Sequence, residues 1–150
     1  MMNKLVNLIK WANSLMAKFP HMLLALMARI FVGMVFLKSG RLKFEDWFVL
    51  KSKTFSLFEN LYSGVPLPPV MAAYMAAYAE VILSFCLIIG FASRLSALGL
   101  LGITATIQIF VFPESYSVHG LWAVALLYVV KYGPCAISVD YFVKKQFANK

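Results

Sequence analysis

The sequence predicts an all-α membrane protein, a bundle of four transmembrane helices preceded by an N-terminal amphipathic helix at the membrane interface. Apolar and aromatic residues make up 62% of the 150 residues, and the mean hydropathy is +0.80, whereas soluble domains contain roughly 45–50% apolar residues. Charged residues make up only 13%, which leaves room for several stretches of the ~20 apolar residues that cross a bilayer. The length suits a single domain with little mass outside the membrane.

The N-terminal segment, residues 3–19, has the pattern of an interfacial helix. Its apolar side chains share one helical face, and a polar stripe runs along the other. The stripe consists of Asn3, Asn7, Lys10, Ser14 and Lys18. The segment has three lysines and no acidic residue, and Trp11 suits the headgroup region, so we expect it to lie on an anionic leaflet. A signal peptide is a weaker alternative, because Arg29 interrupts the following apolar stretch.

Four apolar stretches predict the membrane spans, and their approximate bounds are residues 20–40, 69–90, 94–112 and 119–132. Proline and glycine mark their ends: Pro20 starts the first span, Pro113 follows the third, and Gly133 follows the fourth. The fourth stretch is short for a bilayer. Residues 41–68 form the one long connection, and its aromatic residues, Trp47 among them, indicate surface-lying or partly re-entrant segments.

The net charge of +8 is explained by the membrane rather than by nucleic acid. Basic residues flank the predicted spans, and no stripe of basic residues alternates with exposed aromatic residues. If the N-terminus is inside, eight Lys and Arg residues, Lys150 among them, lie on the inner side and five on the outer side. The positive-inside rule then predicts that both termini are cytoplasmic.

Arg29 and Glu80 are ionisable residues near the middle of predicted spans, where a bare charge costs at least ~2.5–3.5 kcal/mol. Each shares a helical stripe with small residues, so both are expected to face the bundle interior. Arg29 is nine residues from the start of the first span and Glu80 ten from the end of the second. Their depths therefore agree within roughly 2 Å, which predicts a pair. Two interpretations of the pair remain open: a structural salt bridge, and a site for an anion, a quinone or a proton.

A second polar group gathers at the predicted outer face and could bind an anion or a quinone headgroup. Interfacial anchoring of basic and aromatic side chains is the alternative. The candidate residues are Lys38, Arg41, Lys43, Gln108 and His119, with Trp122 beside them.

The sequence contains few potential metal ligands. His21 and His119 begin the first and fourth spans, hence at opposite faces, so they cannot share a haem and no intrinsic haem is expected. Thioethers and an imidazole could hold Cu(I) on the outer half, although core filling is the simpler interpretation of methionine. These weak candidates are Met34, Met71, Met75 and His119. No metal site is predicted.

The two cysteines, Cys86 and Cys135, are far apart in the sequence and form no C-x-x-C motif. Both fall toward the cytoplasmic side, where thiols stay reduced. They are interpreted as structural thiols.

From residue 24 to 141 the sequence resembles the DoxX family of small four-helix bacterial membrane proteins. The matching segments are Ala28-Arg29 with Gly33; Phe36 to Lys43; Val65-Pro66; Ala79-Glu80; Ile88-Ile89-Gly90; Ser93 to Ala97; Gln108, Phe110, Pro113, His119 and Trp122; and Gly133-Pro134 with Ser138-Val139-Asp140. Cys135 departs from the family pattern, which usually has glycine at this position.

The resemblance implies a location in the bacterial cytoplasmic (inner) membrane and a link to quinone-dependent redox systems, which include a thiosulfate:quinone oxidoreductase subunit and oxidative-stress complexes. It also implies that Arg29 and Glu80 correspond to the family's charged pair. The long first loop and residues 110–113 are similar to members encoded beside copper-responsive modified-peptide systems.

Two functions follow as hypotheses. The first is a membrane subunit of a redox or stress-response system in which Arg29 and Glu80 line a polar site and a quinone is the cofactor. The second is a non-enzymatic scaffold or assembly factor, tied to handling of a copper-binding peptide. The sequence has no haem ligand pair and no nucleotide motif, so electron transfer would need a quinone or a partner subunit. A partner subunit or a homo-oligomer is expected. A transporter is less favoured, since four short spans without an inverted repeat leave little room for alternating access.

Overall fold

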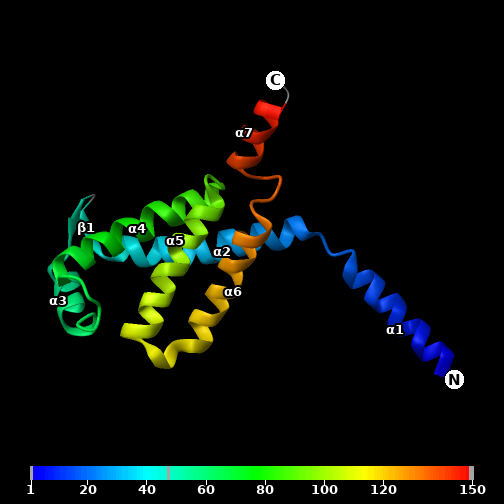
Figure 1. Ribbon diagram of the computed structural model, residues 1–150, viewed down its shortest axis with the longest axis horizontal. Helices are drawn as coiled ribbons and strands as arrows, with labels where there is room; N and C mark the ends of the chain where they lie inside the picture. Colours follow the sequence, from blue (N-terminus) through cyan, green and yellow to red (C-terminus); the bar gives the residue numbers. More distant parts are fainter. Residues whose placement is uncertain (1, 47, 149–150) are drawn as a thin grey trace.

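The computed structural model describes residues 2–46 and 48–148. Trp47 and Lys150, which entered the predictions for the long loop and the charge balance, lie outside the described residues. Four helices form the body of the molecule (Figure 1): α2 (His21–Leu42), α4 (Pro69–Ile89), α5 (Ser93–Thr106) and α6 (Tyr116–Tyr132). The prediction of an all-α membrane architecture is confirmed at this level.

The four helices pack in a ring in which α2 contacts α4, α4 contacts α5, α5 contacts α6, and α6 returns to α2. Their shared core contains Val32, Phe36, Leu87, Ala97, Leu100, Leu126 and Val129. The outer surface is apolar as well, with Phe31 64% and Leu121 72% exposed. An exterior of this kind suits a lipid environment and not water.

Three helical stretches are long and apolar enough to cross a membrane: His21–Leu42, Pro69–Ile89 and Ser93–Val111. They correspond to the first three predicted spans. Helix α6 has 17 residues, which is shorter than the ~20 residues of a full crossing. The fourth span therefore stays a prediction.

Glycines set the close packing of α2 against α4. A Cβ atom added to Gly33 would lie 2.6 Å from Cγ1 of Ile88, and one added to Gly40 would lie 2.7 Å from Cγ2 of Val81 and 3.1 Å from Cβ of Glu80. No real side chain fits at these distances without movement. This register puts Gly33 beside Ile88 and Gly40 beside Glu80.

The long connection after α2 folds into a small hairpin and a helix. Strands β1 (Phe44–Asp46) and β2 (Val49–Leu50) pair antiparallel, and helix α3 (Ser52–Leu61) packs against α4. Leu50 and Phe58 are 3% and 1% exposed beneath them. The hairpin was not predicted, because strands of three and two residues are too short to show alternation.

Helix α5 ends in a π-helical turn, η1 (Ile107–Val111), followed by a 3-10 turn, η2 (Pro113–Ser115). The terminal helices are α1 (Met2–Ala17) and α7 (Val139–Ala148). Helix α1 projects away from the four-helix body (Figure 1), and nearly all of its described side chains are exposed. Its location on a membrane surface stays a prediction.

The packing of α2 on α4 predicts opposite effects for two glycine-to-alanine changes. Gly40→Ala should lower the free energy of unfolding by about 1–3 kcal/mol through overpacking, because its new methyl group meets Val81. Gly102→Ala, with nothing within 4 Å of the added Cβ, should be neutral or stabilising by up to about 1 kcal/mol through helix propensity. Thermal unfolding in detergent checks this, and equal effects at both positions would contradict the proposed register.

Candidate functional site

The predicted pair between Arg29 and Glu80 is not formed, and this prediction was wrong. Glu80 lies at the level of Gly40, eleven residues along α2 from Arg29, and at 1.5 Å per residue this separation is about 16 Å. The depth comparison assumed that the two spans begin and end in the same planes. The glycine contacts instead slide α4 along α2, so that each charge meets a different partner.

Arg29 is 1% exposed and binds the end of helix α4. Its Nε donates to the carbonyl of Leu87 at 3.0 Å, and Nη2 donates to that of Ile88 at 2.8 Å. Nη1 donates to the carbonyl of Ile137 at 3.0 Å and to Sγ of Cys135 at 3.3 Å. The last carbonyls of a helix have no partner within it and carry partial negative charge. Arg29 thereby joins α2, α4 and the segment before α7.

The same end of the bundle is closed by Asp140. Its carboxylate accepts hydrogen bonds from the backbone N–H groups of Ala92 and Ser93 at 2.8 and 2.9 Å and from the Ser93 hydroxyl at 2.8 Å. Its own N–H donates to the carbonyl of Gly90. Gly90 has φ +78°, and an added Cβ would lie 2.5 Å from Nη2 of Arg29. These contacts fasten the C-terminal segment across the turn between α4 and α5.

Glu80 forms its ion pair with Lys43 at the other end of the bundle. The Nζ–Oε2 distance is 2.5 Å, and the Glu80 and Lys43 side chains are 1% and 14% exposed. Nζ of Lys43 also donates to the hydroxyl of Ser39 at 3.0 Å and to its carbonyl at 3.5 Å. Lys43 lies just past the C-terminus of α2 and reaches back into the bundle.

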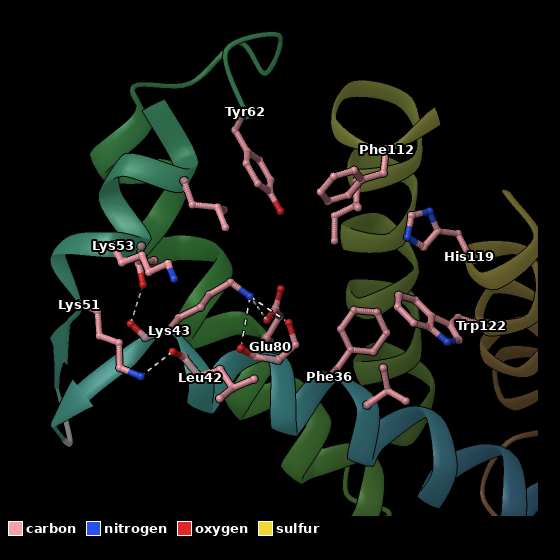
Figure 2. A pocket seen from close by; sticks show the side chains of 15 residues that line it. Phe36, Leu42, Lys43, Lys51, Lys53, Tyr62, Glu80, Phe112, His119 and Trp122 are labelled. Carbon is pink, nitrogen blue, oxygen red and sulfur yellow. Dashed lines mark hydrogen bonds and ion pairs between the residues drawn. The ribbon is translucent and has the colours of Figure 1, made fainter. Parts of the chain in front are cut away.

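A cavity of about 530 Å³ opens over this ion pair. Figure 2 shows Glu80 and Phe36 at its base, Tyr62 on the side of α3, and Phe112, His119 and Trp122 on the side of η1 and α6. The remaining lining residues are Val35, Ser39, Leu42, Lys43, Lys51, Lys53, Thr54, Leu57 and Ile107. The cavity therefore combines an aromatic wall with a buried ion pair.

His119 is held by Gln108 from the neighbouring helical segment. The distance from Nδ1 of His119 to Oε1 of Gln108 is 2.7 Å, and Nε2 of Gln108 donates to the carbonyl of Pro113 at 2.6 Å. His119 is 6% exposed, and its imidazole lies 5.1 Å from the ring of Trp122, which in turn meets Phe36 edge-on at 5.4 Å. The histidine is thus fixed in the cavity wall.

Tyr62 lines both this cavity and a second one of about 310 Å³, as do Glu80 and Ile107. The phenol ring stacks on Phe58 at 4.0 Å. Burial and, to a smaller extent, the negative charge of Glu80 raise the pKa of Tyr62 from 10.0 to about 12. Tyr62 therefore keeps its proton throughout the physiological range.

The structure brings together only part of the predicted outer group. Lys43 and His119 line the cavity and Gln108 positions His119, whereas Lys38 and Arg41 are exposed and do not line it. Sequence reasoning missed the cavity residues that come from the long loop and from the ends of the helices. Lys51, Lys53, Tyr62 and Phe112 are among them, and Phe36 within α2 was missed as well. No pattern distinguishes Tyr62 from the other loop aromatics.

The weak copper candidates are not assembled around His119. Met34, Met71 and Met75 are 53%, 51% and 53% exposed, and none of them lines either of the two cavities that His119 lines. Within the described part of the chain, no three His, Cys, Asp or Glu side chains gather as a metal site would need. Cys86 and Cys135 are free thiols.

A family model identifies the chain. The DoxX family model matches residues 24–113, which is 60% of the 150 residues. The chain belongs to the DoxX family. Comparisons with curated proteins and with solved structures give no match.

The family match confirms the resemblance seen in the sequence. Together with the three apolar helices, it makes this DoxX protein a multi-pass membrane protein. The matched segment contains Lys43, Glu80, Tyr62 and Phe112, whereas His119 follows it.

Arg29 should contribute to stability and not to ligand binding. Arg29→Gln removes three hydrogen bonds to carbonyl oxygens, so we expect a loss of about 3 kcal/mol or more in the free energy of unfolding. Arg41→Gln on the exposed face of the same helix is the matched control and should change it by less than about 0.5 kcal/mol. Thermal unfolding in detergent is the measurement. An Arg29→Gln protein as stable as the wild type would contradict the structural role of Arg29.

The pKa of Tyr62 predicts a pH dependence of stability. Because folding raises the pKa above its unfolded value, the associated stabilisation is complete below about pH 10 and is lost as the pH rises through about 12. The unfolding midpoint should therefore fall less between about pH 9.5 and 11.5 in Tyr62→Phe than in the wild type. Tyr116→Phe, with Tyr116 72% exposed, is the control. Identical falls in all three proteins would contradict the prediction.

Proposed function

We propose that this DoxX protein is an inner-membrane subunit of a redox or stress-response system and that its 530 Å³ cavity binds the headgroup of a quinone. One observation carries the proposal: polar atoms without protein partners border an aromatic-walled cavity at the end of the helix bundle. A largely apolar pocket with a few convergent polar groups is the usual form of a small-molecule site.

The aromatic wall fits a flat ring. Phe36 and Trp122 make an edge-on pair, and Phe112 lies on the same side of the cavity. A quinone headgroup is planar and apolar on both faces, so it can stack against such side chains. The aliphatic side chains of the lining, Val35, Leu42, Leu57 and Ile107, also accommodate the beginning of an isoprenoid tail.

The polar groups fit the edge of the same ring. Among the described residues, the Tyr62 hydroxyl, Oε1 of Glu80 and one ring nitrogen of His119 have no hydrogen-bond partner. Every buried side-chain nitrogen or oxygen in the described part of the chain does have one, so these three unpartnered atoms border open space. A bound quinone would supply two-electron, two-proton redox chemistry. Tyr62 and Lys43 would hold protons beside its oxygens, and Oε1 of Glu80 would accept a hydrogen bond there.

The location of the cavity supports access from the membrane. It lies where α2 ends and α5 turns into η1, at the end of the bundle opposite the Arg29 cluster. In the orientation favoured by the positive-inside rule, with both termini in the cytoplasm, this is the outer half of the inner membrane. In this proposal, electrons come from a partner subunit or pass between copies of the chain.

A scaffold is the second candidate, and the complete pairing of Lys43 supports it. Lys43 binds Glu80 and both oxygens of Ser39, and its carbonyl accepts a hydrogen bond from Thr54 of α3. In this interpretation the ion pair only anchors the long loop to the bundle. The protein would then assist assembly of a complex, including one that handles a copper-binding peptide.

The cavity proposal predicts loss of quinone on mutation. Native mass spectrometry with lipid extraction should find quinone bound to the protein purified in mild detergent. Glu80→Gln and Tyr62→Phe should lower its occupancy by about tenfold, as the loss of one well-placed polar contact does. Glu114→Gln is the control, because Glu114 is exposed and does not line the cavity. Absence of quinone from correctly folded wild-type protein would contradict the proposal.

A charge swap separates the two candidates. Lys43→Glu combined with Glu80→Lys preserves the ion pair and should restore the thermal stability that either single change removes. If the pair is only structural, the swap also restores the activity of the intact partner complex. If the cavity binds a quinone, stability returns while quinone occupancy stays low. The reason is that the carboxylate and the ammonium group have exchanged places relative to the quinone ring.

A further inference from the structure

The hydrogen bonds around His119 determine which of its ring nitrogens carries the proton. The first step is the orientation of the Gln108 amide. Its nitrogen lies 2.6 Å from the carbonyl oxygen of Pro113, and a carbonyl can only accept a hydrogen bond. The amide nitrogen must therefore face Pro113, and the amide oxygen must face His119.

The second step is the proton on His119. Oε1 of Gln108 lies 2.7 Å from Nδ1 of His119, and an amide oxygen can only accept. Nδ1 therefore carries the hydrogen. A neutral imidazole has one ring proton, so Nε2 is left with a lone pair and acts as an acceptor.

The backbone holds these two hydrogen bonds of Gln108 in place. Gln108 belongs to the π-helical turn η1, and the N–H of Phe112 bonds back to the carbonyl of Ile107 at 2.8 Å. The chain then turns through Pro113, which brings its carbonyl within reach of the Gln108 side chain five residues earlier. Single π-helical turns inside α-helices are frequent at functional sites, because they move side chains out of the regular helical register.

The third step is the position of Nε2. The described residues give His119 the hydrogen bond to Gln108 and the ring contact with Trp122 and no other polar partner. His119 is 6% exposed and lines the cavity that contains Glu80 and Tyr62. No buried side-chain nitrogen or oxygen of the described residues lacks a hydrogen-bond partner, so this unpartnered nitrogen borders open space and can accept a hydrogen bond from a ligand.

We propose that Nε2 of His119 accepts a hydrogen bond from a hydroxyl of the bound headgroup, so that the cavity selects the reduced hydroquinone over the oxidised quinone, and that Gln108 is the positioning residue. The choice of ligand rests on the proposed function. A hydroquinone hydroxyl donates to Nε2, whereas a quinone carbonyl would set two acceptors against each other. Oε1 of Glu80 is a second acceptor in the same cavity, which adds to the preference.

The tautomer can be read directly by nuclear magnetic resonance. The chain has two histidines, so ¹⁵N-histidine labelling of a His21→Gln protein leaves the His119 imidazole alone. At about pH 8, where free imidazole is neutral, the nitrogen shifts should show Nδ1–H and a bare Nε2. Gln108→Leu should give a mixture of tautomers, and Gln146→Leu on exposed α7 should not. A wild-type Nε2–H tautomer, or no change in Gln108→Leu, would overturn the assignment.

Ligand selection is tested by calorimetry with a short-chain hydroquinone and the matching quinone under anaerobic conditions. The wild type should bind the reduced form about tenfold more tightly. His119→Phe and Gln108→Leu should bring this ratio toward one, and Gln146→Leu should keep it. Equal affinity of the wild type for both forms overturns the selection while leaving the quinone site intact. Binding of neither form overturns the proposed function and, with it, the ligand named for His119.

Discussion

The close packing of α2 against α4 is the constraint on which the rest of the structure depends. Gly33 and Gly40 let the two helices meet where any side chain would collide with Ile88 or Val81. Small residues at a helix contact are the usual means of tight packing in a membrane, since lipid provides no hydrophobic drive for helix association. The resulting register decides which groups each buried charge can reach.

The two ends of the bundle use charge in different ways. At one end, Arg29 and Asp140 are satisfied by backbone groups and bind the C-terminal segment to the turn after α4. At the other end, the pair of Lys43 and Glu80 borders open space. A charge saturated by protein carbonyls stabilises a fold, whereas charges and unpartnered polar atoms at a cavity are available to a ligand.

The cavity is assembled from segments that are individually unremarkable. The long loop contributes Tyr62, the π-helical turn aligns Gln108, and α6 contributes His119. Irregular backbone near a membrane is tolerated where it is buried in protein or lines a cavity. In this DoxX protein, such irregular segments line the cavity that opens over the ion pair of Lys43 and Glu80.

The sequence by itself determined the membrane class, the first three spans, the family and the burial of Arg29 and Glu80. These features depend on composition, hydrophobic length and local motifs. Only the tertiary structure decided the partners of those charges. Arg29 and Glu80 have similar depths in their own spans, but helix register is set by side-chain contacts such as those of Gly40, which no periodicity reveals. The same holds for Tyr62 and Lys43, whose roles depend on how α3 packs against α4. Long-range packing, and not local pattern, made the candidate site.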